Sequence, residues 1–316
     1  MKKSVKFNPF SAYSTQLNAQ FQAAKASENP AFYLYKNGAR NIVFMLEGLT
    51  RIHKNAFDDA KMEKWYDRFK LLEDFLGQID HGEAFKNEFG ASKLMNAQAV
   101  AALNEKIEKP IADFNALLTA DKWLDNKLYK FDAFIEKNKF KYDAKYNAAI
   151  VKAYQKEVKK ITAFATELDF NLKELETELH ELRRKLRWLS IYPQAFNGLF
   201  QFEKPAVNPD WSAKYMTEQV VNSPFNQLPK AVENTPIIYL NYPNFIALSF
   251  IIQEFGKLKD KGLAADLLAT EFKKSEAQIK KLLADKYLDK TTILSNASQL
   301  LKTFFEDKVL GTLIKR

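Results

Sequence analysis

The residues best suited to chemistry lie in one short basic stretch, Leu179-His180-Glu181-Leu182-Arg183-Arg184-Lys185-Leu186-Arg187. On a helix, four cationic side chains of this stretch stand at positions i, i+3, i+4 and i+7 and share one face: His180, Arg183, Arg184 and Arg187. A guanidinium group donates paired hydrogen bonds to phosphate oxygens, and several in a row suit a repeating phosphate chain. A protonated histidine adds a further donor. The stretch therefore predicts a binding face for a polyanion.

The same spacing also allows a purely structural interpretation. Like charges at i and i+4 destabilise an isolated helix by about 0.2–0.5 kcal/mol per pair, so something should neutralise them. Glu176, Glu178 and Glu181 are close enough in sequence to do so. In that alternative the segment is the solvated, salt-bridged flank of an ordinary bundle, and the spacing alone leaves both interpretations open.

A second basic region lies upstream and can place four lysines on one helical face: Lys145, Lys152, Lys156 and Lys159. This row either extends a phosphate-binding surface or is the solvated outside of a long helix, and we favour the second interpretation. Tyrosines lie among the lysines, a mixture that also suits single-stranded nucleic acid. No nucleic-acid-binding motif accompanies them, so nucleic acid is not the expected partner.

The composition favours an anionic partner and excludes several kinds of site. The 316 residues include 48 lysines and arginines against 39 acids, a formal net charge of +9 that attracts anions. There is no cysteine, which excludes disulfides, thiolate metal sites and a cysteine nucleophile. The longest apolar run, 245–252, is too short to span a bilayer, and no apolar run of a signal peptide follows the basic start. We therefore expect a cytoplasmic protein without a membrane partner.

The chain lacks the signatures of the common enzyme classes. Its three histidines are scattered, at His53, His81 and His180, and do not have the spacing of a metal centre. No HExxH, Walker, GxSxG or dinucleotide-binding motif occurs. We expect a binding protein with no catalytic residues, no metal and no cofactor.

The apolar pattern predicts helices almost throughout. Glycine and proline are scarce, at 9 and 10 residues, and apolar residues recur at helical spacing. The clearest stripe is Leu172, Leu175, Leu179, Leu182, Leu186 and Leu189. We expect helices near 31–54, 60–76, 96–118, 121–136 and 141–169, and a leucine-striped helix that ends before Pro193. Prolines then cluster as far as Pro243, which predicts an irregular insertion at 193–243 with short helical pieces.

Two distant segments resemble each other, 72–82 and 252–262. In each, an apolar residue and a glycine are followed by an acid and then a second glycine. We interpret each first glycine as the end of a helix, and the similarity of the two segments suggests an internal duplication.

The basic stretch resembles the signature helix of the CHAD family, the conserved histidine α-helical domain. In that family, basic residues follow the histidine by three, seven and ten positions. His180, Arg183 and Arg187 fit the first three places, and Ser190 stands where the family has arginine. The later segments 255–260 and 263–268 are also similar to the pattern of the family's second repeat.

The resemblance implies an all-α fold of two tandem four-helix-bundle repeats packed side by side around a basic cavity that binds inorganic polyphosphate. We place a degenerate first repeat at 14–165 and the second repeat at 166–316. In the first repeat, Lys36 and Arg40 stand where the signature helix is expected, without its histidine. The predicted polyphosphate site, formed across the repeat interface, consists of His180, Arg183, Arg184, Arg187, Lys36 and Arg40.

The alternative to polyanion binding is a helical scaffold or protein-interaction module that has kept the fold and lost the ligand. Its binding surface is then expected to be apolar and to lie near the insertion at 193–243. Another polyanion could replace polyphosphate in the first interpretation, and the sequence specifies no oligomeric state.

Overall fold

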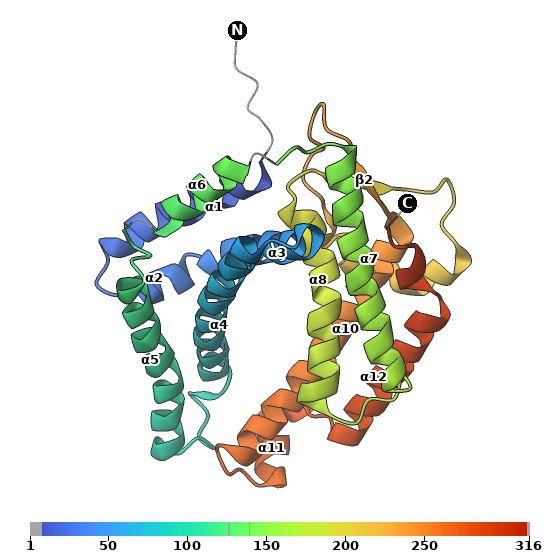
Figure 1. The fold of residues 1–316 in the computed structure, drawn as a ribbon. Coiled ribbons are helices and arrows are strands. Elements are labelled where there is room, and N and C mark those ends of the chain that lie inside the picture. The colour runs from blue at the N-terminus through green and yellow to red at the C-terminus, as the bar shows by residue number, and fades with distance from the viewer. Residues whose placement is uncertain (1–7, 126, 139, 315–316) are drawn as a thin grey trace. The chain divides into compact units, whose positions relative to one another are not determined.

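The computed structural model describes residues 8–125, 127–138 and 140–314 and divides the chain into two compact units at Tyr142. Helices make up most of the described residues, and the sheet among them is a single pair of four-residue strands. The all-α prediction is therefore confirmed (Figure 1). The helix over 144–167 belongs to the second unit, whereas the sequence-based division places most of it in the first repeat.

Among the described residues, unit 1 is built from six helices. They are α1 (Pro9–Lys25), α2 (Pro30–Lys36), α3 (Ala39–Phe57), α4 (Ala60–Phe89), α5 (Ala97–Ala120) and α6 (Lys127–Asn138). Asparagine or aspartate side chains cap the starts of α1, α2, α4 and α5, which satisfies amide groups that have no partner within the helix. Helix α3 packs on α1 and α4, α5 packs on α4, and α6 packs on α1.

Three predicted helix boundaries in unit 1 are wrong. The expected helix over 31–54 is interrupted by Gly38, whose φ of +73° lies in the left-handed region that favours glycine. The helix expected to stop near Gly77 continues to Phe89. The part of α4 beyond Gly77 buries Ile79 and Phe85. This burial offsets the roughly 1 kcal/mol by which a glycine destabilises the interior of a helix. The helix expected from Asp121 begins at Lys127.

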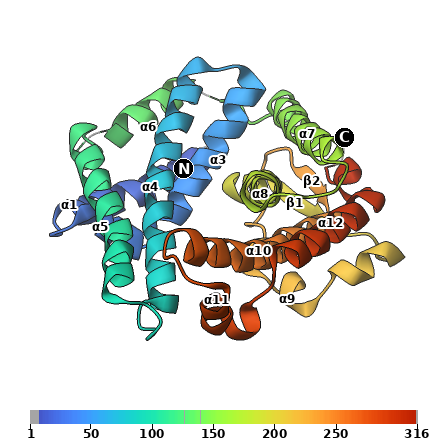
Figure 2. The same cartoon turned by 90° about the horizontal axis from the view of Figure 1, so that it is seen from below.

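Unit 2 has a helical frame with an irregular insertion. The frame consists of α7 (Ala144–Glu167), the π-helical turn η1 (Leu175–His180), α8 (Glu181–Ala195), α10 (Tyr242–Thr270), α11 (Glu276–Leu283), the turn η4 (Ala284–Lys286), α12 (Lys290–Glu306) and the turn η5 (Val309–Thr312). Figure 2 looks along α8, which has α7 on one side and α10 on the other. Helix α12 packs on α10.

The predicted leucine stripe forms the buried side of η1 and α8, except that Leu172 lies in the irregular segment before η1. All six leucines are at most 3% exposed. The expected end before Pro193 is wrong, because α8 continues to Ala195. Proline lacks the N–H group that would bond to the carbonyl of Leu189. That carbonyl instead accepts a hydrogen bond of 2.8 Å from the hydroxyl of Tyr154 on α7, so the helix continues with this acceptor satisfied.

The insertion at 193–243 contains the predicted short helical pieces and two strands that were not predicted. The pieces are η2 (Asp210–Tyr215), α9 (Glu218–Val221) and η3 (Pro224–Asn226). The strands β1 (Phe200–Glu203) and β2 (Ile238–Asn241) pair in parallel, with Phe200 opposite Ile238. Ile314 near the C-terminus adds a bridge to Leu240, which ties the end of the chain to this small sheet.

Candidate anion-binding site

The predicted basic face is formed by the last residue of η1 and the first two turns of α8. His180 has helical backbone angles (φ −65°, ψ −44°), so the chain passes from η1 into α8 without a break. The spacing of i, i+3, i+4 and i+7 is therefore preserved from His180 to Arg187. Arg184 is exposed, whereas Arg183 and Arg187 are half-buried.

Two of the predicted cations have acidic partners on the same helical segment. The Nδ1 atom of His180 lies 2.8 Å from a carboxylate oxygen of Glu176. Arg184 donates to Glu181, whose carboxylate also receives Lys185 at 2.9 Å. Partial burial is the largest single influence on the pKa of Glu181 and raises it. The contacts with Lys185 and Arg184 together outweigh this effect, so the pKa is lowered. The local ion pairs considered in the structural interpretation are therefore present.

The acids of this segment do not match its cations one for one. The carboxylate of Glu181 is shared between two cations. Glu178 accepts hydrogen bonds from the backbone amides of Lys173 and Glu174, so it serves as a cap for the preceding turn. Residues 175–195 contain four arginines and lysines against three glutamates, so the segment has a small excess of positive charge.

Arg183 has a packing role that its sequence position does not reveal. Its Nε donates a 3.2 Å hydrogen bond to the backbone carbonyl of Ile252 on α10. The guanidinium lies against Gly256, where a Cβ atom would be 3.0 Å from Nε. Burial lowers the pKa of Arg183, while the charge of Asp260 acts in the opposite direction. Arg183 therefore joins α8 to α10.

Both predicted site residues of unit 1 are also paired with acids. Lys36 lies 3.2 Å from Glu83. Arg40 donates to Glu73 at 2.9 Å and to Asp80 at 2.5 Å, both on α4. Whether Lys36 and Arg40 meet the α8 residues in one site stays a prediction.

Arg40 and Arg183 meet corresponding glycines of the two similar sequence segments. A Cβ atom on Gly77 would lie 3.0 Å from Nη2 of Arg40, much as Gly256 faces Arg183. Both glycines lie inside long helices, α4 and α10, so the expectation that each ends a helix is wrong. In both cases the missing side chain makes room for an arginine from the preceding long helix of the same unit.

The second glycine of each segment also marks a close helix contact. A Cβ atom on Gly82 would lie 2.8 Å from Ile107 on α5, and one on Gly262 would lie 2.8 Å from Leu175 on η1. Side-chain contacts of this kind leave room for hydrogen only. The spacing of the glycines was visible in the sequence, but their role as close contacts depends on which elements pack against them.

Unit 1 also contains two buried ionisable groups. His53 is fully buried among aromatic rings, with centroid distances of 4.7 Å to Phe10 and 5.2 Å to Phe140, and burial lowers its pKa to about 4. Its Nδ1 lies 2.6 Å from the carbonyl of Leu49, which fits a neutral ring that donates from this nitrogen. Burial is also the main cause that raises the pKa of Glu47, to about 8. Both groups are therefore held mainly uncharged at neutral pH.

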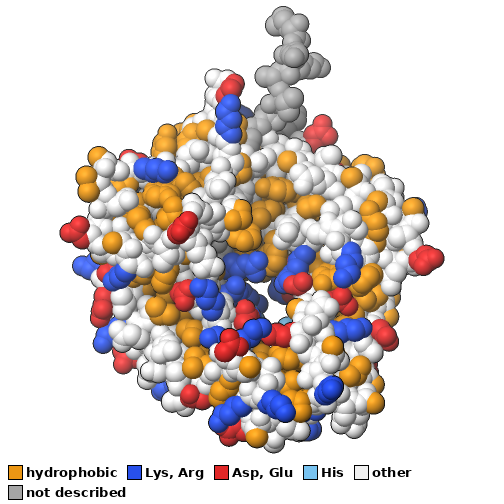
Figure 3. Space-filling model, turned by 180° about the vertical axis from the view of Figure 1, so that it is seen from behind, with side chains coloured by type: hydrophobic (Ala, Val, Ile, Leu, Met, Phe, Trp, Pro, Cys, Tyr) orange, Lys and Arg blue, Asp and Glu red, His pale blue; other side chains and the backbone are white. Residues whose placement is uncertain are grey.

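Other kinds of site find no support in the part of the chain that the structure describes. No group of three or more histidine, aspartate or glutamate side chains is placed to hold a metal ion there. No helix over 8–314, the two uncertain positions aside, combines the length and apolarity needed to cross a membrane. On the face drawn in Figure 3, basic and acidic side chains are interspersed.

Comparison with known proteins yields no relative: no family model, no curated protein and no solved structure matches the chain. The resemblance to the CHAD family therefore rests on the sequence motifs alone.

Proposed function

We propose that the protein is a cytoplasmic, non-catalytic polyanion-binding protein and that its ligand is inorganic polyphosphate. The observation that carries the proposal is the incomplete neutralisation of η1 and α8, where one carboxylate serves both Arg184 and Lys185. The pair between exposed Arg184 and half-buried Glu181 still reaches solvent and contributes on the order of 1 kcal/mol, so a phosphate group can replace the carboxylate at small cost. A guanidinium can then bind two phosphate oxygens at once.

The geometry supports different roles for the basic residues. Arg184, with its exposed side chain, is suited to direct contact with phosphate. Arg183 is suited to holding α8 against α10, because its Nε is already bonded to the carbonyl of Ile252. In this proposal Arg187 and His180 add contacts from the same helical face, and Lys36 and Arg40 join them in a basic cavity between the repeats.

We also propose that the two units are copies of one four-helix repeat, α1–α3–α4–α5 and α7–α8–α10–α12. Each set packs its second helix on its first and third, and its fourth helix on its third. The contacts of Arg40 with Gly77 and of Arg183 with Gly256 occupy the same place in this order. Agreement of helix order and of an unusual arginine–glycine contact supports a duplication.

The test is a titration with long-chain polyphosphate. Arg184→Gln combined with Arg187→Gln removes two charge-assisted contacts, each worth about 1.5–3 kcal/mol, so the affinity should fall at least about tenfold. Affinity for the parent protein should weaken steeply with salt, as expected when phosphate contacts release counterions. Circular dichroism checks that the variant remains helical.

The matched control removes the same charge elsewhere. Lys280 and Lys281 are exposed on α11, and Lys280→Gln with Lys281→Gln should leave the affinity within about twofold. Equal affinity of the α8 variant and the parent would refute the proposed site, and a parent that does not bind would refute the function.

A second candidate function is the helical protein-interaction module. It is favoured by two apolar side chains in the insertion at 193–243, Val207 at 82% and Phe225 at 74% exposed. Large exposed apolar side chains at a folded surface are typical of contact sites when they gather in one region. In this role polyphosphate should bind no better than heparin at equal ionic strength, so the same titration separates the two candidates.

A further inference from the structure

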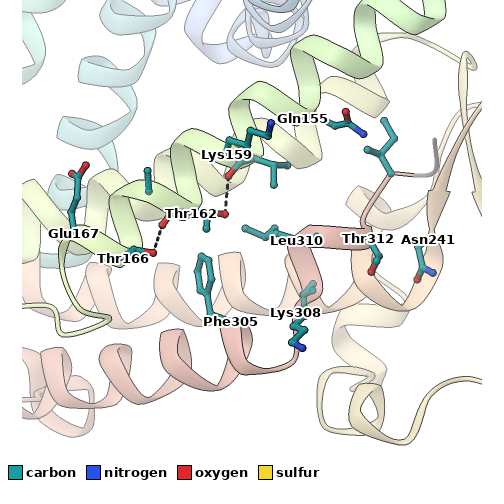
Figure 4. A pocket seen from close by; sticks show the side chains of 15 residues that line it. Gln155, Lys159, Thr162, Thr166, Glu167, Asn241, Phe305, Lys308, Leu310 and Thr312 are labelled. Carbon is teal, nitrogen blue, oxygen red and sulfur yellow. Dashed lines mark hydrogen bonds between the residues drawn. The ribbon is translucent and has the colours of Figure 1, made fainter.

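A long groove in unit 2 follows the face of α7 that does not pack on α8 (Figure 4). Its volume is about 1360 Å³, and at Gln155 it meets a second cavity of about 410 Å³. The α7 residues that line the two cavities run from Asn147 to Glu167. At 1.5 Å per residue this is a trough of roughly 30 Å, the length of a helix of about 20 residues.

The walls of the groove are largely apolar. Half-buried Val158 lies on the α7 side, and Phe305 and Leu310 form part of the opposite wall. The hydroxyl of Thr162 donates to the carbonyl of Val158 at 3.0 Å, and that of Thr166 donates to the carbonyl of Thr162 at 2.9 Å (Figure 4). Because these hydroxyls are satisfied within their own helix, an apolar surface can cover them without leaving a donor unpaired.

The edges of the groove carry cations that lack acidic partners. Lys152, Lys159 and Lys308 line the two cavities, and among the described residues none of them forms an ion pair. Lys160, one residue further along α7, is instead paired with Glu157 at 2.8 Å. Glu167 is the acid among the lining residues, so the groove has a net positive charge. This differs from the α8 face, where His180 is paired with Glu176 and Arg184 with Glu181.

Unit 1 contains a helix at the corresponding point of the chain. There the twelve-residue α6 follows α5 and packs on α1, with the ring of Phe131 5.6 Å from that of Phe10. In unit 2 the described residues after α12 form the four-residue turn η5, which Asn244 holds by a 2.6 Å hydrogen bond to the carbonyl of Val309. Because η5 is much shorter than α6, the residues described up to position 314 leave room along α7 for a helix.

We infer that this groove docks an amphipathic helix of a partner protein, with an apolar face toward Val158 and Leu310 and acidic residues along its edges. The apolar walls favour a folded helix over a bare anionic polymer, because a phosphate chain has no apolar surface to bury. The unpaired lysines select acidic edges by charge complementarity. The inference is independent of polyanion binding at α8, since no residue of the α8 face lines the groove.

The experiment uses the full chain and two labelled helical peptides of about 20 residues, matched to the groove length. Both carry leucine at positions i, i+3, i+4 and i+7; one has glutamate along both edges and the other has lysine. In fluorescence anisotropy, the glutamate peptide should bind at least tenfold more tightly. Lys152→Glu with Lys159→Glu should remove or reverse this preference. Ala163→Trp, which fills the groove, should weaken binding of the glutamate peptide at least tenfold.

The matched control is Lys145→Glu with Lys156→Glu, on the same helix but outside both cavities. It should change the affinity less than threefold. Equal binding of the two peptides, or an equal loss in the control, would overturn the inference, because the attraction would then be general. Polyphosphate binding that depends on Lys152 and Lys159, without peptide binding, would assign the lysines to a polyanion and also overturn it. So would a monomer–dimer equilibrium abolished by Ala163→Trp, since the occupant would then be a second copy.

Discussion

Arg40 in unit 1 and Arg183 in unit 2 fill the same place in two similar helix arrangements, but they are held by different chemistry. Arg40 is bound by two carboxylates, Glu73 and Asp80. Arg183 is bound by a neutral carbonyl, and its Nε, close to the backbone, is the atom nearest to Gly256. A glycine facing an arginine is therefore the shared structural feature, whereas the groups that bind the arginine differ between the two units.

The two units also differ in their buried ionisable groups, which gives the largest expected difference between them. The pKa of His53 in unit 1 is about 4 instead of 6.5. His53 is therefore neutral in the native state, and above pH 6.5 the neutral side chain makes its full contribution to stability. As the pH falls from 6.5 toward 4, His53 becomes protonated in the unfolded chain but stays neutral in the native state. The free energy of unfolding therefore decreases by about 3 kcal/mol.

Denaturant unfolding at pH 7.5 and pH 4.5 tests this expectation. Trp65 and Trp123 report unit 1 when Trp188 and Trp211 of unit 2 are replaced by phenylalanine. His53→Leu in the same background should lose less stability on acidification, by about 2–3 kcal/mol. Parallel pH dependences of the two proteins would contradict the assigned protonation state.

Replacing the second glycine of either segment, Gly82 or Gly262, by alanine should destabilise the two units to a similar extent. Gly262→Ala would place a Cβ atom 2.8 and 2.9 Å from the two methyl groups of Leu175, and Gly82→Ala would place one 2.8 Å from Ile107. Overpacking costs about 1–3 kcal/mol, and the better helix propensity of alanine returns about 1 kcal/mol. Each variant should therefore lose up to about 2 kcal/mol of stability in chemical denaturation. Gly311→Ala, with no atom within 4 Å of the new methyl group, serves as the control, and a loss there of the same size would remove the packing explanation.

Replacing the first glycine of each segment, Gly77 or Gly256, by alanine should give the smallest change in the free energy of unfolding. It is also the sharpest test, because the change should have opposite signs in the two units. On Gly77 the new methyl group meets the terminal Nη2 of Arg40 at 3.0 Å, and we expect this nitrogen, which is not the atom bonded to Glu73 or to Asp80, to shift by a few tenths of an ångström. Gly77→Ala should then gain about 0.5–1 kcal/mol from helix propensity. On Gly256 it meets Nε of Arg183, which is fixed by its bond to Ile252. Gly256→Ala should lose about 1 kcal/mol.

A double-mutant cycle of Gly256→Ala with Arg183→Ala checks that the loss comes from this contact. If the penalty of alanine at Gly256 persists without the arginine side chain, the contact is not its cause. Gains in both units would show that Arg183 is as adaptable as Arg40.

Local patterns in the sequence were sufficient for the helical class and for the basic face. Few glycines and prolines, and the leucine stripe from Leu172 to Leu189, predicted helices with a buried side, and the six leucines are buried. The spacing from His180 to Arg187 predicted a shared face because a helix has 3.6 residues per turn. The similarity of 72–82 to 252–262 was also visible, because it is a matter of residue types in order.

Properties that depend on a neighbouring element were decided only in the tertiary structure. Gly77 and Gly256 look like helix ends in sequence, yet each lies within a helix, and an arginine from another helix occupies the space beside it. Pro193 remains inside α8 because the hydroxyl of Tyr154 satisfies the carbonyl that proline leaves without a donor. A sequence pattern records which residues can share a face, whereas the partners of that face are set by segments far away in the chain.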